Sequence, residues 1–208
     1  LTHAFNASAK DLCGHQTLLW ERFLQHFGLE NKIRFSPFVL KDTATKILDR
    51  RIVGIAPGSS NNPSKRWPTK QWCKLLENLL PKDQDLQFRL FGTLEDLSIT
   101  NIIEAELPSS HVKNLAGTTD MVGLVKGLSQ CDLLVCNDSG AMHLANAIGI
   151  PVLALFGPTD ANTTGPAYEA PHTLIYPSEK QTTNAFNKTM RAIDLDSVIQ
   201  SACRLLHI

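Results

Sequence analysis

The sequence predicts an α/β protein with a doubly wound parallel sheet, and three observations support that prediction. From residue 51 onward, short apolar runs alternate with amphipathic stretches that have helical spacing. The apolar runs are nearly continuous, as is typical of strands buried on both faces of a sheet. The helices between them are the connections that parallel strands require. A Rossmann-like fold is therefore expected for this part of the chain.

The individual elements can be placed in chain order. We expect strands at residues 52–56, 86–91, 133–136 and 152–156, with weaker candidates at 112–115 and 173–176. The expected helices span residues 69–80, 94–107, 120–129, 141–148 and 196–206. Thr69 is a candidate N-cap, and Thr119 or Asp120 is the N-cap of the third of these helices. Gly149 stands where a C′ glycine ends a helix.

Residues 1–50 have a different pattern. Residues 15–28 carry an apolar stripe at helical spacing that ends at Gly28, and residues 31–49 form a connection. A helix packed against a neighbouring domain fits this segment best. Because the chain opens without methionine, we expect a fragment that lacks an upstream domain. The predicted division is therefore 1–50, the end of that domain with a linker, and 51–208, a ligand-binding domain. Residues 161–190 are expected to form one long loop.

Composition limits the classes of function. The 208 residues contain 20 basic and 20 acidic side chains, so the formal net charge is zero. No long-range field attracts nucleic acid, and nucleic-acid binding is not expected. The five cysteines are scattered without C-x-x-C spacing, which predicts reduced, mostly buried thiols in a cytosolic protein. The seven histidines are dispersed, so neither a metal site nor a cofactor is expected.

The loop after the strand at 52–56 carries residues suited to a phosphate group. Gly58 lets the backbone approach a ligand, and Ser59 and Ser60 offer hydroxyl and amide donors. Lys65 and Arg66 supply positive charge. The loop matches neither the Walker pattern nor G-x-G-x-x-G. A solvated pair of surface cations is an equally good interpretation of Lys65 and Arg66.

The turn Asn137-Asp138-Ser139-Gly140 follows a second buried strand, at the sheet edge where ligands collect in α/β proteins. Ser139 and Gly140 would place their N–H groups at a helix start, which favours an anion. His143 either donates a hydrogen bond to a phosphate or packs against the loop. Asp138 would repel a phosphate unless it is paired or turned away. Helix capping with loop bracing is therefore as strong an interpretation of Asp138 as ligand contact.

Two further loops are candidates for the same crevice. Glu95 follows the strand at 86–91, and an acidic residue there can hold both hydroxyls of a ribose. Asp96 competes for that role, and stabilisation of a helix dipole is the alternative for both. Residues 156–160 and 163–166 can line the crevice, although a plain turn explains Gly157-Pro158 equally well. Together the loops indicate a site for a diphosphate.

Six motifs occur in an order and spacing known from one family. They are Pro57-Gly58-Ser59, Lys65-Arg66-Trp67-Pro68, Phe91-Gly92-Thr93, Leu115-Ala116-Gly117-Thr118-Thr119, Asn137-Asp138-Ser139-Gly140-Ala141-Met142-His143-Leu144-Ala145 and Leu155-Phe156-Gly157-Pro158-Thr159-Asp160. This set resembles the ADP-heptose:lipopolysaccharide heptosyltransferases of glycosyltransferase family nine. The resemblance implies a GT-B architecture, with residues 51–208 as its carboxy-terminal, donor-binding domain.

The resemblance also implies roles for residues. Lys65 would contact the diphosphate, Glu95 would hold the ribose hydroxyls, and Asp138, Ser139 and Gly140 would cradle phosphate and sugar. The family's catalytic aspartate sits near the start of the amino-terminal domain, whose positions are absent here. No catalytic residue is therefore named, and the isolated chain is expected to be inactive.

The implied reaction is the inverting, metal-independent transfer of heptose from ADP-heptose to the inner core of lipopolysaccharide. The acceptor would be the lipopolysaccharide core on lipid A at the membrane surface. The implied location is cytoplasmic, with a peripheral place at the inner face of the inner membrane. Two alternatives remain open: a non-catalytic nucleotide-sugar-binding module, and a related GT-B nucleotide-sugar enzyme such as an epimerase.

Overall fold

The protein folds around one six-stranded sheet in which every neighbouring pair of strands is parallel. The computed structural model describes residues 5, 7, 14–29, 35–38, 50–59, 62–177 and 189–208. The strand order is β3-β2-β1-β4-β5-β6, so the direction of winding reverses between β1 and β4. This is the order of a doubly wound Rossmann sheet. The predicted fold class is confirmed.

Strands and helices alternate along the described chain. The strands are β1 (Ile52–Ala56), β2 (Gln87–Leu90), β3 (Val112–Asn114), β4 (Leu133–Asn137), β5 (Val152–Leu155) and β6 (His172–Ile175). The helices are α1 (Gln16–His26), α2 (Thr69–Leu79), α3 (Leu97–Ala105), α4 (Met121–Leu128), α5 (Gly140–Ala147), α6 (Ala161–Thr164) and α7 (Leu195–Leu206). Short 3-10 turns lie at η1 (Pro63–Lys65), η2 (Leu80–Lys82), η3 (Leu94–Asp96) and η6 (Met190–Ala192).

Each predicted strand and helix overlaps an observed one, and the differences have local causes. The helix expected at 94–107 begins as the 3-10 turn η3 before α3. Thr69 is the first helical residue of α2 and not its N-cap, because Pro68 occupies the cap position. Asp120 is the N-cap of α4, and its carboxylate accepts the Gly123 N–H. The expectation of one long loop at 161–190 was wrong, because this stretch contains α6 and β6, and its residues 178–188 lie outside the described part.

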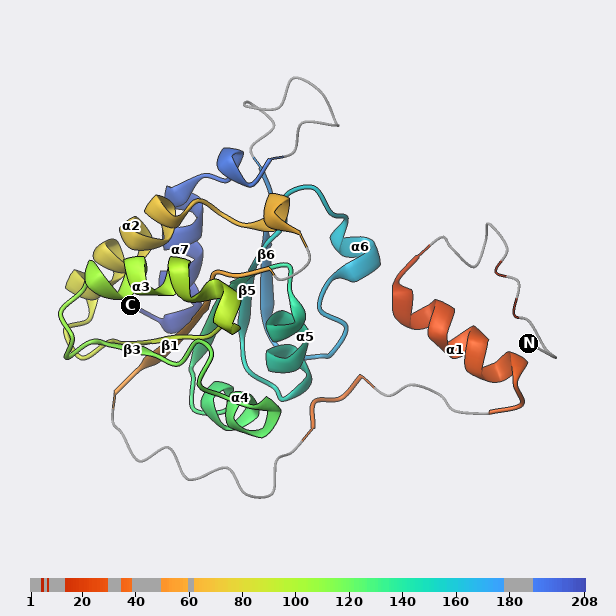
Figure 1. The fold of residues 1–208 in the computed structure, drawn as a ribbon. Helices are drawn as coiled ribbons and strands as arrows, with labels where there is room; N and C mark the ends of the chain where they lie inside the picture. The colour runs from red at the N-terminus through yellow and green to blue at the C-terminus, as the bar shows by residue number, and fades with distance from the viewer. Residues whose placement is uncertain are drawn as a thin grey trace.

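The two faces of the sheet bury two separate cores. Along β1, Val53 and Ile55 pack with α2, α3 and α7, whereas Ile52 and Ala56 pack with α4 and α5. Figure 1 shows these two groups of helices on opposite sides of the sheet. Every residue of β1 and β4 is buried, which explains why these central strands are continuous apolar runs in the sequence.

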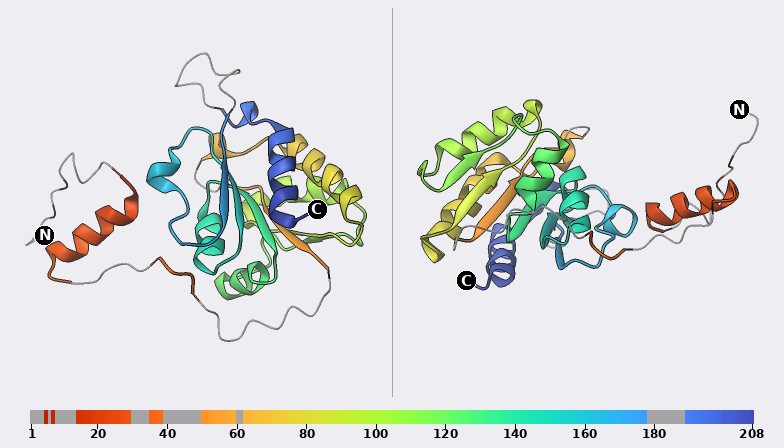
Figure 2. Two further views of the ribbon diagram at one scale, coloured as in Figure 1. Left: turned by 180° about the vertical axis from the view of Figure 1, so that it is seen from behind. Right: turned by 90° about the horizontal axis from the view of Figure 1, so that it is seen from below.

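Helix α1 lies beside the sheet domain in both views of Figure 2. None of its residues is buried, and Leu18 and Trp20 are exposed by 45% and 60%. Its N-cap, His15, contacts the sheet domain: the Nε2 atom of His15 lies 3.0 Å from the carbonyl oxygen of Gly165. The apolar stripe of this helix agrees with the expected amphipathic pattern. Its packing against a neighbouring domain, and the boundary at residue 51, stay predictions.

The described cysteines are mostly buried, as the sequence predicts. Cys73 and Cys136 are buried free thiols, Cys131 is buried, Cys203 is a partly buried free thiol, and Cys13 lies outside the described residues. Burial raises the pKa of the Cys136 thiol, with a smaller contribution from Asp138. In the part of the chain that the structure describes, no helix combines the length and apolar character that a membrane span needs.

Candidate functional site

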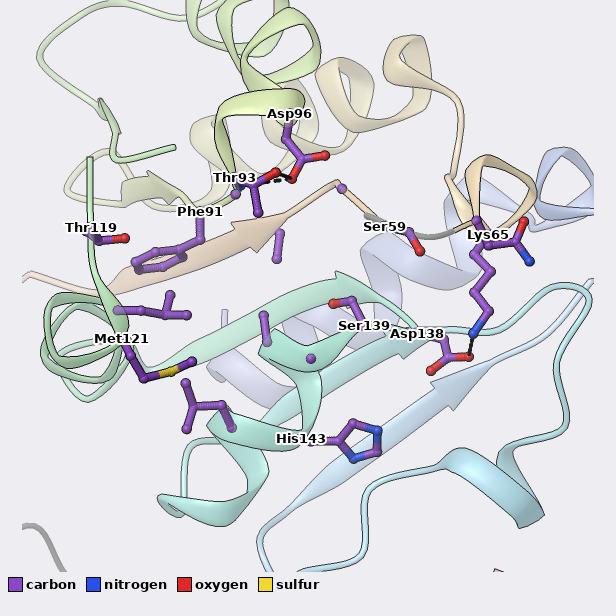
Figure 3. A pocket seen from close by; sticks show the side chains of 18 of the residues that line it. Ser59, Lys65, Phe91, Thr93, Asp96, Thr119, Met121, Asp138, Ser139 and His143 are labelled. Atoms are coloured by element: carbon purple, nitrogen blue, oxygen red, sulfur yellow. Dashed lines mark hydrogen bonds and ion pairs between the residues drawn. The ribbon is translucent and has the colours of Figure 1, made fainter. Parts of the chain in front are cut away.

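A cleft of about 1190 Å³ opens at the carboxyl ends of the strands. Residues after β1, β2 and β4 line it, together with residues of α4 and α5. Because the winding reverses between β1 and β4, the helices that follow these strands diverge to opposite faces and leave a crevice. The two loops singled out in the sequence therefore meet at this switch point (Figure 3).

Helix α5 begins at the cleft without a side-chain cap. Its N-cap, Ser139, has extended backbone (φ −152°, ψ 170°), and the Ser139 side chain makes no capping hydrogen bond. The Ser139 hydroxyl is buried and has no hydrogen-bond partner among the described residues. A Cβ added to Gly140 would find no heavy atom within 4 Å. Free N–H groups that face open space at a helix start suit an anion.

Lys65 and Asp138 form an ion pair at the cleft (Figure 3). The Lys65 Nζ lies 2.7 Å from Asp138 Oδ2, and the Thr159 hydroxyl donates to the same oxygen at 2.7 Å. The Asp138 side chain is 6% exposed and that of Lys65 is 22% exposed. Asp138 therefore braces three loops, as one interpretation expected. The helix-capping part of that interpretation was wrong, because α5 has no side-chain cap.

His143 lies in the first turn of α5 and lines the cleft. Burial lowers the pKa of His143. Asp138 opposes that shift, whereas His15 and Lys65 reinforce it. The imidazole is therefore neutral near pH 7, with one ring nitrogen able to donate a hydrogen bond. Figure 3 shows the ring on the same side of the cleft as Asp138.

The side chain of Arg66 has different partners from that of its neighbour Lys65. Its guanidinium donates to the Ser59 carbonyl from Nε at 3.3 Å and from Nη2 at 3.1 Å. It also lies 3.5 Å from Asp96 Oδ1. Arg66 does not line the cleft, whereas Lys65 does. The interpretation of the two as a solvated pair is wrong, because both side chains are engaged and only partly exposed.

The two acidic residues after β2 differ in environment. Asp96 is 3% exposed, and its Oδ2 accepts from the Thr93 N–H at 2.9 Å and from the Thr93 hydroxyl at 3.0 Å. Glu95 is exposed and is not among the cleft-lining residues. Its contact with a ribose stays a prediction. The structure thus brings together six of the seven predicted site residues: Ser59, Lys65, Asp138, Ser139, Gly140 and His143.

Sequence reasoning assigned no role to the apolar part of the cleft. Leu94 and Met121 line it and are exposed by 70% and 68%, and the buried ring of Phe91 also lines it. Large exposed apolar side chains that gather in a cleft often mark a binding surface. Their position just after β2 and β3 was the available signal. Among the described residues, no group of three or more His, Cys, Asp or Glu is placed to hold a metal ion.

Fold and site together define a Rossmann-type domain with an anion-binding crevice at its switch point. The family model of glycosyltransferase family 9 (heptosyltransferase) matches residues 24–194. The chain belongs to this family, as the resemblance of its motifs indicated.

Individual relatives agree with this assignment. The chain is 35% identical over 162 residues to lipopolysaccharide heptosyltransferase 2 of Salmonella typhimurium, covering 76% of this chain and 43% of that protein. The solved structure of E. coli ADP-heptose LPS heptosyltransferase II superposes with a TM-score of 0.66 at 26% identity, covering 98% and 53%. A family 9 glycosyltransferase from Veillonella parvula shares the fold, with a TM-score of 0.76 at 21% identity over 99% and 62%. The chain thus spans about half the length of the proteins it matches.

Proposed function

We propose that this chain is the donor-binding part of a heptosyltransferase that transfers heptose from ADP-heptose to the inner core of lipopolysaccharide. The observation that carries the proposal is the uncapped start of α5, which faces open space at Gly140 with Lys65 across the cleft. That arrangement suits a diphosphate. The names of the relatives support heptose as the sugar and ADP as its carrier.

The rest of the cleft fits a nucleoside. The apolar side chains of Leu94 and Met121 offer a surface for a flat base. In the sheet, β1 lies between β2, which precedes Leu94, and β4, which precedes α5. Glu95, exposed on η3 beside that surface, is the proposed partner of the ribose hydroxyls. Ser59 reaches the cleft from the β1 loop and is a further donor. The base, the ribose and the diphosphate would thus lie in that order from η3 to α5.

In the proposed reaction an acceptor hydroxyl attacks the anomeric carbon of the heptose. The bond from that carbon to the ADP oxygen breaks, and the configuration inverts. Negative charge grows on the departing diphosphate, where the α5 N–H groups, Lys65 and a ring N–H of His143 stabilise it. These donors supply the role that a metal ion has in other transferases. A general base in the other half of the full-length enzyme would take the acceptor's proton.

The proposed acceptor is the lipopolysaccharide core on lipid A. Because that acceptor is held in a membrane, the full-length enzyme would work at the cytoplasmic face of the inner membrane by peripheral association.

Calorimetric titration of the chain with ADP, ADP-heptose and UDP-sugars tests the donor assignment. ADP and ADP-heptose should bind, and UDP-sugars should bind at least tenfold more weakly. Lys65→Ala should reduce the affinity, whereas Lys70→Ala should not, because Lys70 is an exposed cation outside the cleft. A preference for UDP-sugars would favour a related enzyme such as an epimerase.

A transfer assay then separates an enzyme from a binding module. The full-length protein should transfer heptose to a lipopolysaccharide acceptor, and the 208-residue chain should not. Binding of ADP-heptose without transfer by the full-length protein would point to a module. Transfer by the isolated chain would contradict the placement of the base elsewhere.

A further inference from the structure

One buried amide side chain holds both ends of the loop between β1 and α2. Asn137, the last residue of β4, is fully buried. Its Nδ2 donates to the carbonyl oxygen of Pro57 at 2.7 Å and lies 3.4 Å from that of Gly58. Its Oδ1 accepts the backbone N–H of Trp67 at 3.2 Å. These partners lie 70–80 residues away in sequence, at the two ends of residues 57–67.

The chemistry of this position favours a carboxamide over other side chains. The loop presents carbonyl acceptors at one end and an N–H donor at the other, and an amide offers both complements. A carboxylate of the same shape keeps the acceptor but turns a negative charge toward the Pro57 carbonyl. An apolar side chain leaves buried backbone groups without partners, which costs free energy. Asn137 is also a polar exception in a strand that is otherwise Leu-Leu-Val-Cys.

The clamped loop carries two groups that line the cleft, Ser59 and Lys65. Arg66 closes the same loop from within by donating to the Ser59 carbonyl. Asn137 itself is followed directly by Asp138 and Ser139, which begin the turn into α5. The Asn137 amide therefore connects the β1–α2 loop to the turn into α5, and residues of both segments line the cleft. A second link between the same two segments is the ion pair of Lys65 with Asp138.

We propose that Asn137 is a positioning residue that holds the β1–α2 loop in its ligand-ready conformation. It need not touch the ligand, and it acts through Lys65 and Ser59. The choice of ADP as the ligand rests on the proposed function, whereas the ordering of the loop does not. Losing the clamp should weaken the hold on phosphate and leave the nucleoside contacts at Leu94 and Met121 intact.

Asn137→Asp and Asn137→Ala test the proposal in the full 208-residue chain. Hydrogen exchange should show the amides of residues 64–67 opening at least tenfold faster in Asn137→Ala, because that variant removes the acceptor of the Trp67 N–H, whereas Asn137→Asp keeps it. The Kd for ADP should rise about tenfold or more, while the Kd for adenosine stays within about twofold. Leu206→Ala is the control, since Leu206 is buried on α7 in the core and lies outside the cleft. It should lower stability without changing loop exchange or the ratio of the two affinities.

The possible results separate this proposal from the proposed function. Unchanged protection of residues 64–67 in Asn137→Ala would overturn the clamp, and an equal loss of ADP and adenosine affinity in either variant would overturn it too. The same changes in Leu206→Ala would reduce the effect to general destabilisation and also overturn it. If the wild-type chain does not bind ADP, the proposed function fails, and the exchange rates alone decide the clamp. If Asn137→Ala does not fold, the ratio of the ADP and adenosine affinities of Asn137→Asp, which loses the donor to the Pro57 carbonyl, decides the clamp.

Discussion

Gly140→Ala should raise stability and lower ADP affinity in the same protein. Gly140 is the first residue of α5, and its φ is not positive, so alanine fits its backbone. An added Cβ meets no heavy atom within 4 Å. Replacing a helical glycine at such a position stabilises a protein by about 0.4–1 kcal/mol, largely through the unfolded chain. The variant should therefore unfold at a higher denaturant concentration than the wild type.

The same methyl group enters the space where the diphosphate is proposed to lie. If it displaces one charge-assisted hydrogen bond, the loss is about 1.5–3 kcal/mol. That loss corresponds to an affinity about 10- to 160-fold lower, since 1.4 kcal/mol is about tenfold. Gly140→Val should lose more, because its branched side chain fills more of the opening.

Chemical denaturation and calorimetry with ADP measure the two effects separately. Gly149→Ala is the matched control because it changes the same residue type at the other end of α5. Gly149 has φ +83°, where alanine is strained, and it does not line the cleft. This control should lose stability and keep its affinity for ADP. Unchanged ADP affinity in Gly140→Ala would refute the anion site at the start of α5.

Three further perturbations test individual side chains. Lys65→Ala should weaken ADP binding by about 1–3 kcal/mol. Adding Asp138→Asn should recover part of that loss, because it removes the carboxylate that Lys65→Ala leaves unpaired. Calorimetry of the wild type, both single variants and the double variant measures both effects. Burial lowers the pKa of His143, so its contribution to the free energy of unfolding is complete above pH 6.5 and is lost as pH falls toward the folded pKa. His143→Gln should therefore make the free energy of unfolding less dependent on pH, as denaturation at several pH values would show. Glu95→Gln should weaken ADP binding but not the binding of ADP that lacks both ribose hydroxyls, as competition titrations would show.

The sequence was sufficient to predict the sheet and the loops that line the cleft. Strands β1 and β4 are buried on both faces, so their apolar runs are unambiguous, and polar residues follow each strand within three positions. Ligand groups in α/β sheets gather at such positions. The start of α5 could therefore be located from Ser139 and Gly140 alone.

The choice between adjacent residues of similar chemistry could not be made in the same way. Lys65 lines the cleft and Arg66 does not, because the 3-10 turn η1 ends between them. Asp96 is buried in a capping box with Thr93, whereas Glu95 is exposed. In each pair, the local backbone over one or two residues decides which side chain lines the cleft or is buried. Hydrophobic periodicity carries no information about such short segments.

The long-range hydrogen bonds of the cleft were also beyond sequence reasoning. Asn137 was singled out as part of a motif, but its partners lie 70 or more residues earlier in the chain. The Thr159 hydroxyl donates to Asp138 across 21 residues. Only the sheet order, which places β1 and β5 on either side of β4, makes these partners neighbours.

The cleft balances its charges within the folded chain. Lys65 pairs with Asp138, and Arg66 with Asp96, so each cation of the β1 loop already has a carboxylate partner. A diphosphate therefore meets no large excess of positive charge, in agreement with the zero formal net charge of the chain. In the proposed function, its binding comes from the fixed N–H groups of α5 and from a share of Lys65. Because fixed donors act only on a ligand at the right distance, we expect the proposed clamp at Asn137 and the space at Gly140 to affect ADP affinity more than the number of cations does.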